Sequence, residues 1–362
     1  MSSSFGNALR LTLFGQSHSE GIGVVLDGLP AGEAIDMELV QAFLARRAPG
    51  QSTLTTQRVE SDMPQVLSGL VGTETCGAPL CAVFTNADVR SADYAALRDV
   101  PRPGHADFPA HIKFRGHNDI RGGGHFSARL TAPLCFAGAV AMQVLARRGI
   151  HIGAHIASVG PIVDSRFDPV NLKQAALLAP GQRTIATIDA AAAEAMAMEV
   201  EAARLAGDSV GGTVECGILG LPVGLGAPIF DGLENRLSAA VFAIPAVKGI
   251  EFGAGFAAAA MRGSENNDAY YYEDDMVKTR TNRHGGILGG LSSGMPLLFR
   301  VAFKPTPSIA QTQDSVRLSQ KESTAMQLGG RHDPCVVLRA TPCVEAAAAV
   351  VILDAMLSEG RL

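Results

Sequence analysis

The sequence predicts a mixed α+β protein in which central helices are sandwiched between antiparallel sheets. Three observations predict this fold class. Two segments are apolar around nearly the whole circumference of a helix, so each must be covered on all sides. Several shorter segments are rich in β-forming residues or alternate between apolar and polar positions. The connections between these segments vary in length and lack the regular strand–helix alternation of a parallel sheet.

The two apolar helices are expected at residues 132–149 and 344–357. The first is closed by Gly149 after two arginines, which is a typical signal for the end of a helix. Strands are expected at residues 9–14, 23–27, 80–85, 150–159, 212–219 and 295–303. No linker, charge block or solenoid-length repeat divides the chain, so we expect a single domain over residues 1–362.

The composition disfavours several classes of function. The chain is 47% hydrophobic and 5% aromatic, which is ordinary for a globular protein. Its net charge of −5, from 30 basic and 35 acidic residues, disfavours general nucleic-acid binding. The 6 cysteines form no C-x-x-C pair, which indicates reduced thiols. The N-terminal segment lacks the apolar stretch of a signal peptide, and residues 131–146 are short for a membrane span. We therefore expect a cytoplasmic protein that binds no membrane.

Four regions combine glycine with basic or nucleophilic residues in a way that a hydrophobic core does not need. They are LFGQSHSEGIG with Ser17 and His18, RPGHADF with Arg102 and His105, RGGGHFSARLTA with His125, Ser127 and Arg129, and the C-terminal trio HGGILGGLSSG, KPTPSI and RHDPC. Glycine runs let backbone N–H groups approach a planar or anionic ligand closely. A helix that begins right after Ser127 would direct its positive end toward the same ligand. Each motif alone is weak, but a structural role does not explain four of them with histidines alongside.

Arginine side chains predict the chemistry of the ligand. Arg47, Arg102, Arg129 and Arg331 carry planar forks suited to carboxylate and phosphate groups. A locally cationic pocket in a net-acidic protein favours a small polyanion as its ligand.

The histidines are candidates for metal binding and for acid–base roles. Residues 105–125 contain four of the 9 histidines, but their spacing matches no usual zinc pattern, so we expect no metal. We assign acid–base work to His18 and His105, and surface positions to His111 and His117.

The remaining histidines carry less information. His151 and His155 alternate with apolar residues, which places both on one face of a strand in a structural role. His284 precedes a glycine loop and is ambiguous.

In this order the motifs resemble those of chorismate synthases over residues 5–357. The points of similarity are FGQSHS, DGLPAG, RRAPGQS, RPGHADF, RGGGHFSARLTA, AVKGIEFG, HGGILGGLSSG, KPTPSI and RHDPC. The resemblance implies a β–α–β sandwich, assembled as a homotetramer. It also implies a carbon–oxygen lyase that converts 5-enolpyruvylshikimate-3-phosphate to chorismate and phosphate by an anti-1,4-elimination. The implied cofactor is reduced FMN, regenerated in each turnover. FAD and NADP are further nucleotides that the resemblance associates with this activity.

The resemblance also implies residue roles. His18 would protonate the departing phosphate with Ser17 beside it, His105 would stabilise the anionic reduced flavin, and Asp333 would help flavin N5 to remove the C6 proton. The substrate carboxylates and phosphate would be held by Arg47, Arg102, Arg129 and Arg331. Contacts to FMN would come from His125, Phe126, Ser127, Ala246, Gly289, Lys304, Pro305, Thr306, Pro307, Ser308 and Arg331.

The chain departs from the family pattern at a few positions. Gln16 and Ser19 replace the usual Glu and second Gly of FGESHG, and Leu130 replaces a common Glu. His125-Phe126-Ser127 stands where many members have Arg-Ser-Ser. Thr53 stands where an arginine proposed to contact NADP often lies, which argues against a pyridine-nucleotide site.

Three alternatives remain open. Gln16 would fit a catalytically inactive paralogue that binds FMN or another polyanion. A flavin reductase with its own NADPH site would need a G-x-G-x-x-G run after a strand, which the sequence lacks. A protein-interaction module would need no pocket of histidines and arginines. The source of flavin reduction, either NADPH directly or a separate flavin reductase, also remains open.

Overall fold

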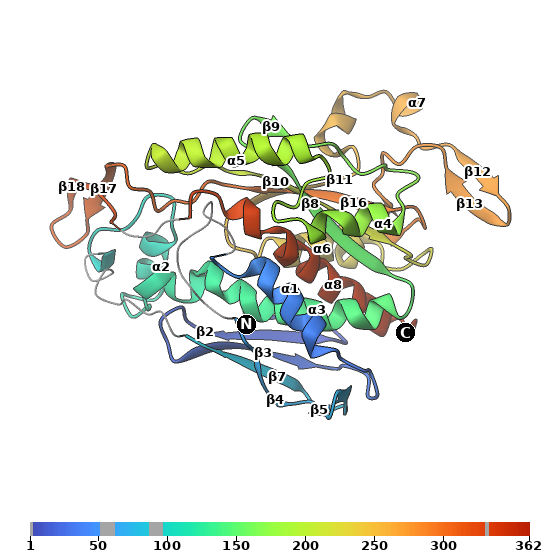
Figure 1. Ribbon diagram of the computed structural model, residues 1–362, viewed down its shortest axis with the longest axis horizontal. Helices are drawn as coiled ribbons and strands as arrows, with labels where there is room; N and C mark the ends of the chain where they lie inside the picture. Colours follow the sequence, from blue (N-terminus) through green and yellow to red (C-terminus); the bar gives the residue numbers. More distant parts are fainter. Residues whose placement is uncertain (1–2, 51–61, 87–96, 330–332) are drawn as a thin grey trace.

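Two antiparallel sheets enclose a layer of helices (Figure 1). The structure is a computed structural model that describes residues 3–50, 62–86, 97–329 and 333–362. The strands of the first sheet, in spatial order, are β1 (Ser4–Phe5), β2 (Arg10–Gly15), β3 (Gly21–Asp27), β7 (Leu80–Thr85) and β4 (Gln65–Ser68). The strands of the second are β11 (Val247–Phe252), β16 (Leu297–Phe303), β10 (Gly212–Leu219), β8 (His151–Val159) and β9 (Ile162–Val163).

The middle layer consists of α1 (Met37–Arg47), α3 (Thr131–Ala146), α6 (Leu233–Val241) and α8 (Thr341–Ser358). Helix α3 contacts β2, β3 and β7 of the first sheet and β8 of the second, which explains why it is apolar on every side. Gly138 lets α3 approach α8 closely, because a Cβ at this position would overlap Ala346. By length and hydropathy alone α3 and α8 could each cross a membrane, but both are mostly buried between the two sheets.

The outer face of the second sheet is also covered. Helices α4 (Gln174–Leu178) and α5 (Ala190–Leu205) lie over it (Figure 1). A small cluster of Phe167, Leu172, Leu177 and Leu298 packs there, and Gly153 on β8 allows Leu177 to contact the strand. One larger cluster of buried apolar residues runs through the middle layer and the inner faces of both sheets.

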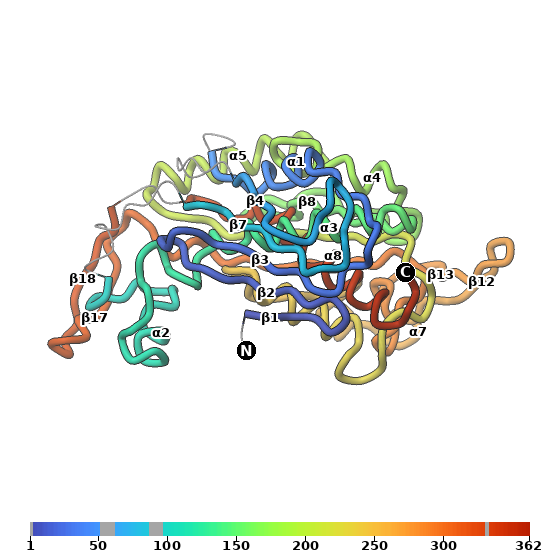
Figure 2. The backbone as a smooth tube through the Cα atoms, turned by 90° about the horizontal axis from the view of Figure 1, so that it is seen from below, coloured from blue at the N-terminus to red at the C-terminus, as the bar shows by residue number. Residues whose placement is uncertain are grey.

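Smaller elements extend from the two ends of the sandwich. The hairpin of β17 (Gln313–Arg317) and β18 (Glu322–Met326) lies beside α2 (Asp107–Lys113) at one end, and the hairpin of β12 (Tyr270–Glu273) and β13 (Met276–Thr279) projects from the other (Figure 2). The remaining elements are β5 (Leu70–Val71), β6 (Glu74–Thr75), α7 (Gly263–Asn266), β14 (Ile287–Leu288) and β15 (Leu291–Ser292).

All six predicted strands and both apolar helices are present, with ends shifted by a few residues. The first helix ends at Ala146 rather than Gly149, which adopts φ 75° just beyond it. The architecture is the predicted one, with central helices between antiparallel sheets.

Candidate active site

A pocket of about 650 Å³ is lined in part by His105 and Ala106, which directly precede α2. Segments far apart in the sequence form its wall, from residues 102–106, 122–131, 242–248, 303–308 and 336–343. The predicted site residues on this wall are Arg47, Arg102, His105, His125, Phe126, Ser127, Ala246, Lys304, Thr306, Pro307 and Ser308. A pocket of this size accommodates a cofactor and a small substrate.

The glycine run brings the two predicted acid–base histidines close to each other. Gly122, Gly123 and Gly124 all adopt positive φ, at 59°, 85° and 55°. A Cβ on Gly122 would lie 2.6 Å from Ser17 Oγ and 2.7 Å from His18 Nε2. A Cβ on Gly123 would lie 3.3 Å from His105 Nε2. Only glycine therefore fits between these side chains, and Ser17 and His18 lie behind Gly122 rather than on the wall itself.

Ser127 ends the glycine segment and begins the next helical segment. Its hydroxyl accepts a hydrogen bond from Arg129 N at 3.3 Å, as the N-cap of the short 3-10 turn Ala128–Leu130 that leads into α3. The expected helix start after Ser127 is thus present, and its positive end faces the pocket.

One carboxylate binds both Arg102 and His105. Asp107 accepts hydrogen bonds from Arg102 Nε at 2.7 Å and Nη2 at 2.8 Å, and its Oδ1 lies 2.6 Å from His105 Nδ1. Burial works to raise the pKa of Asp107, but the hydrogen bonds from Arg102 and His105 hold it well below its usual range. Arg102 Nη1 also donates to Ser308 Oγ, another residue of the pocket wall, at 3.4 Å.

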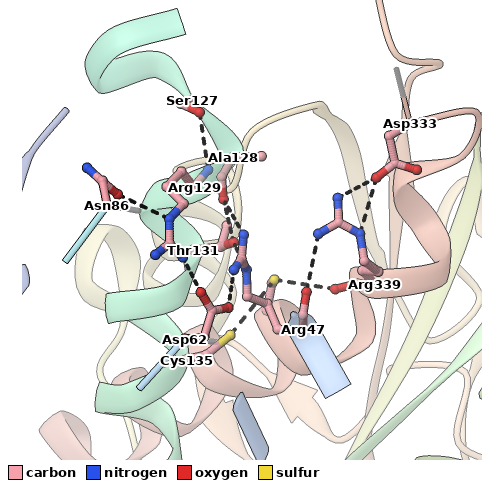
Figure 3. A network of polar contacts seen from close by, with 11 residues as sticks. Arg47, Asp62, Asn86, Ser127, Ala128, Arg129, Thr131, Cys135, Asp333 and Arg339 are labelled. Carbon is pink, nitrogen blue, oxygen red and sulfur yellow. Dashed lines mark hydrogen bonds and ion pairs between the residues drawn. The ribbon is translucent and has the colours of Figure 1, made fainter. Parts of the chain in front are cut away.

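A second carboxylate joins two of the predicted substrate arginines (Figure 3). Asp62 forms ion pairs with both Arg47 and Arg129 and is almost fully buried. Arg47 Nε also donates to Thr131 Oγ1 at 3.0 Å, and Arg129 Nε donates to Asn86 Oδ1 at 3.3 Å. These bonds fix both guanidinium planes before any ligand binds.

Asp333 lies on the opposite side of this network (Figure 3). Its Oδ2 pairs with Arg339, whose Nη1 donates to the carbonyl of Arg47 at 3.3 Å. Its Oδ1 is buried and has no hydrogen-bond partner among the described residues. Asp333 is not itself on the pocket wall, but Arg339 is. Arg331 and Thr53 lie outside the described residues.

Two thiols lie beneath the arginine network. Cys135 on α3 and Cys343 on α8 are both buried, with their sulfurs 3.9 Å apart, and Cys343 is on the pocket wall. Burial raises the pKa of Cys135 well above its ordinary value.

Only some of the other predicted flavin contacts line the pocket. Lys304 Nζ donates to the carbonyl of Gly104 at 2.6 Å, and burial together with nearby Lys248 lowers its pKa. Thr306 Oγ1 is buried without a hydrogen-bond partner in the part of the chain that the structure describes. Pro305 is exposed next to the wall, and Gly289 lies in the β14–β15 turn; neither lines the pocket.

The unusual residues of the first motif have a local role. Ser19 Oγ lies 2.8 Å from the carbonyls of both Gln16 and Gly21, either of which can accept its one hydrogen, and it accepts from Gln16 N at 3.0 Å. Asn86 Nδ2 also donates to the Gln16 carbonyl at 3.0 Å. The side chain of Gln16 is exposed, so this position contributes its backbone to the turn that carries Ser17 and His18.

Sequence reasoning missed three residues of the site: Asp62, Asp107 and Arg339. Asp107 is inside the quoted motif RPGHADF, so its nearness to Arg102 and His105 was available as a signal. Asp62 and Arg339 reach the site only through the tertiary fold, and no local pattern marks them.

The sandwich fold, the glycine run between two histidines and the carboxylate-paired arginines at the pocket together indicate an enzyme that acts on a small polyanion. Comparisons with known proteins agree. The family model described as chorismate synthase matches residues 9–357. This chain is 44% identical over 360 residues to a chorismate synthase of Dehalococcoides mccartyi, covering 99% of this chain and 98% of that protein. It is 47% identical over 358 residues to one of Methanocella arvoryzae, covering 99% and 95%.

A solved structure shows the same architecture. A crystal structure of a chorismate synthase, 26% identical, matches with a TM-score of 0.77 and covers 98% of this chain and 93% of that chain. The chain belongs to the chorismate synthase family, whose members are lyases. The resemblance and the fold class predicted from sequence are therefore confirmed.

Proposed function

We propose that this protein converts 5-enolpyruvylshikimate-3-phosphate to chorismate and phosphate by an anti-1,4-elimination that depends on reduced FMN. The observation that carries this proposal is the glycine run, which lies between His18 and His105 at the wall of an arginine-lined pocket. An elimination of phosphate needs a proton donor at the leaving oxygen, a base at C6 and cations for the anionic groups. The site contains side chains suited to each task.

The pocket fits a flavin. Residues 242–248 supply an apolar wall, on which Ala246 adopts φ 73° and accepts a hydrogen bond from Lys304 N at 3.0 Å. The buried hydroxyl of Thr306 needs a partner that a bound ligand would provide. His125, Phe126, Ser127, Ala246, Lys304, Pro307 and Ser308 would also contact it, with Gly289, Pro305 and Arg331 as further proposed contacts. When bound, reduced FMN supplies electron density to the allylic system and recovers it as the proton leaves.

The protein residues bind the substrate and move protons. His18, close to Ser17 behind Gly122, gives its proton to the departing phosphate oxygen. Asp333 accepts the C6 proton. Its Oδ1 supports this role, because it has no hydrogen-bond partner among the described residues and Arg339 pairs with the other oxygen. Arg47 and Arg102 on the pocket wall, with Arg129 beside Arg47, hold the carboxylate and phosphate groups of the substrate, and Arg331 is proposed to join them. His105 stabilises the negative charge of the reduced cofactor.

A direct experiment tests the proposal. Under anaerobic conditions, substrate and pre-reduced FMN should give the absorbance of chorismate, and oxidised FMN should give none. Because the elimination is redox-neutral, dithionite should restore turnover without stoichiometric consumption. Binding of FMN without product would identify an inactive paralogue, and NADPH oxidation coupled to each product formed would rule the mechanism out.

The proposal also covers the compartment, the oligomeric state and the domain organisation of the enzyme. We infer a cytoplasmic homotetramer in which each chain forms one domain over residues 1–362. A separate flavin reductase could supply the reduced cofactor, since the sequence carries no dinucleotide-binding fingerprint.

A further inference from the structure

We propose that Asp107 is a positioning residue for the elimination: its carboxylate fixes His105 with the proton on Nδ1, turns Nε2 toward the glycine run, and holds the guanidinium of Arg102 in plane. The inference rests on the proposed function for its kinetic consequences, but the tautomer of His105 can be measured without any turnover.

The geometry around His105 Nδ1 decides the tautomer. Among the described residues, two groups lie within hydrogen-bond distance of this nitrogen, Asp107 Oδ1 at 2.6 Å and Arg102 Nη2 at 3.1 Å. One ring nitrogen cannot both donate to the first and accept from the second. The carboxylate is ionised and brings no proton, so the hydrogen of this short contact belongs to Nδ1. Arg102 then uses its N–H groups for Asp107 and rests against the imidazole.

The other ring nitrogen is directed toward the ligand. A Cβ on Gly123 would lie 3.3 Å from Nε2, so this edge of the ring faces the glycine run and the pocket. Arg102 Nη2 lies 3.4 Å from Nε2 as well as 3.1 Å from Nδ1, so the guanidinium is close to both ring nitrogens. With Nδ1 protonated, Nε2 carries either a lone pair or a second proton, and it presents that site to whatever occupies the pocket.

The same carboxylate holds Arg102 by two parallel bonds, to Nε at 2.7 Å and Nη2 at 2.8 Å. Its side chain is only 5% exposed, and it also accepts a hydrogen bond from the backbone N of Arg102 at 3.1 Å. All groups around Asp107 are therefore donors. An asparagine has one acceptor oxygen and places an NH₂ against these donors, so it must give up either the histidine or the arginine fork.

The experiment combines a double-mutant cycle with NMR. Asp107→Asn, His105→Ala and the double variant are compared in kcat and KM with substrate and pre-reduced FMN. We expect Asp107→Asn to lower kcat by about 10-fold or more in the parent, as for a misplaced acid–base histidine. In the His105→Ala background its effect on kcat should shrink to within about two-fold, whereas the rise in KM through Arg102 should persist.

A second readout needs neither substrate nor flavin. In ¹⁵N-histidine-labelled protein, the parent should show His105 protonated on Nδ1, assigned by its loss in His105→Ala. Asp107→Asn should shift it toward the Nε2-protonated form or a mixture. Glu201→Gln is the matched control, because it removes a carboxylate from an exposed bidentate arginine pair on α5, with bonds of 2.7 and 2.6 Å to Arg204. It should change neither kcat nor the His105 signals.

The possible results distinguish a failure of the positioning role from a failure of the proposed function. An equal loss of kcat in both backgrounds, or an unchanged tautomer in folded Asp107→Asn, would overturn the positioning role. If Asp107→Asn does not fold, Asp107→Glu keeps the charge at a different reach, and the same two readouts apply to it. A parent without elimination activity but with the Nδ1 proton lost on substitution would defeat the proposed function and leave the positioning inference standing.

Discussion

His155 and His105 each bind a carboxylate, but the two rings lie in different surroundings. His155 on β8 is fully buried, with Nδ1 3.0 Å from Asp164 and Nε2 2.9 Å from Glu215. Its ring packs edge-on against Phe167, with centroids 4.6 Å apart. His105 has a carboxylate at Nδ1 but directs Nε2 toward Gly123 and the pocket.

The difference lies in the bonding positions left for a ligand. Backbone N–H groups of Ile188 and Asp189 also bind Asp164, and Phe167 N binds Glu215, so the interior cluster is closed by the protein. Burial opposes the charge on His155, but hydrogen bonds to the two carboxylates outweigh it and raise the pKa of this histidine. A closed cluster stabilises the fold, whereas a site needs groups whose partner comes from outside.

The largest expected effect lies on the pocket side. His18→Ala should slow the elimination by ~10²–10⁴, the usual range for a general acid, and leave FMN affinity nearly unchanged. His117→Ala, at an exposed position after α2, is the control and should retain parental activity. Single-turnover rates with pre-reduced FMN provide the measurement. Activity within a few-fold of the parent would remove His18 from the role of acid.

The next effect lies in the interior and concerns stability. His155→Ala would leave Asp164 and Glu215 as buried carboxylates without their shared cation, at a cost of about 3–5 kcal/mol in the free energy of unfolding. Urea denaturation should show this loss, while the kcat of the folded fraction stays close to the parent value. His151→Ala on the same strand is the control, since this histidine is only partly buried. If His155→Ala lost kcat but kept its stability, His155 would have a catalytic role and not a structural one.

The pH dependence of stability sharpens the same point. The folded pKa of His155 is raised, so its contribution is fully present below the unfolded value of about 6.5 and is lost as pH rises through the folded pKa. The pKa of Asp164 is lowered, so its contribution is present above about 3.9 and is lost as pH falls through its folded pKa. The difference in urea midpoint between the parent and His155→Gln should therefore narrow as pH rises above about 6.5. A difference that widens toward alkaline pH would contradict the charged cluster.

The sequence predicted the interior of the fold better than its polar connections. Segments apolar on all sides have one physical solution, burial between layers, and both such helices are there. The amphipathic strand pattern of residues 150–159 likewise placed His155 in a structural role. Helix α5 and the small hairpins were not anticipated, because their exposed, mixed composition carries no single periodic signal.

The sequence motifs predicted many residues of the site but not the carboxylates that bind its arginines. Arg47 and Arg129 were expected to face substrate, yet each is held by Asp62, which lies beyond any local pattern. Their aspartate partners neutralise much of the cationic charge that the arginines alone suggested. Which bonding positions remain open for a ligand depends on these tertiary contacts, and composition cannot reveal them.

The smallest expected effect tests the open positions directly at Thr306. Its hydroxyl is buried on the pocket wall, without a partner among the described residues, in contrast to every member of the His155 cluster. Thr306→Val keeps the shape and removes the hydroxyl. If bound FMN supplies the missing partner, flavin affinity should fall by about 2- to 10-fold, the value of one hydrogen bond of about 0.5–1.5 kcal/mol. Without ligand, the variant should be as stable as the parent or slightly more so, because a buried unpaired hydroxyl has been removed.

Flavin fluorescence titration and thermal unfolding measure the two quantities on the same samples. Thr12→Val is the matched control, since its hydroxyl is already bonded to Ser4 Oγ at 2.9 Å on β1 and should not affect FMN. A loss of stability in ligand-free Thr306→Val with unchanged flavin affinity would mean that the protein itself satisfies this hydroxyl. Thr306 would then resemble His155, whose polar groups are all bonded within the protein. A loss of affinity alone places it with His105, because only a group with an open bonding position responds to the ligand and not to the fold.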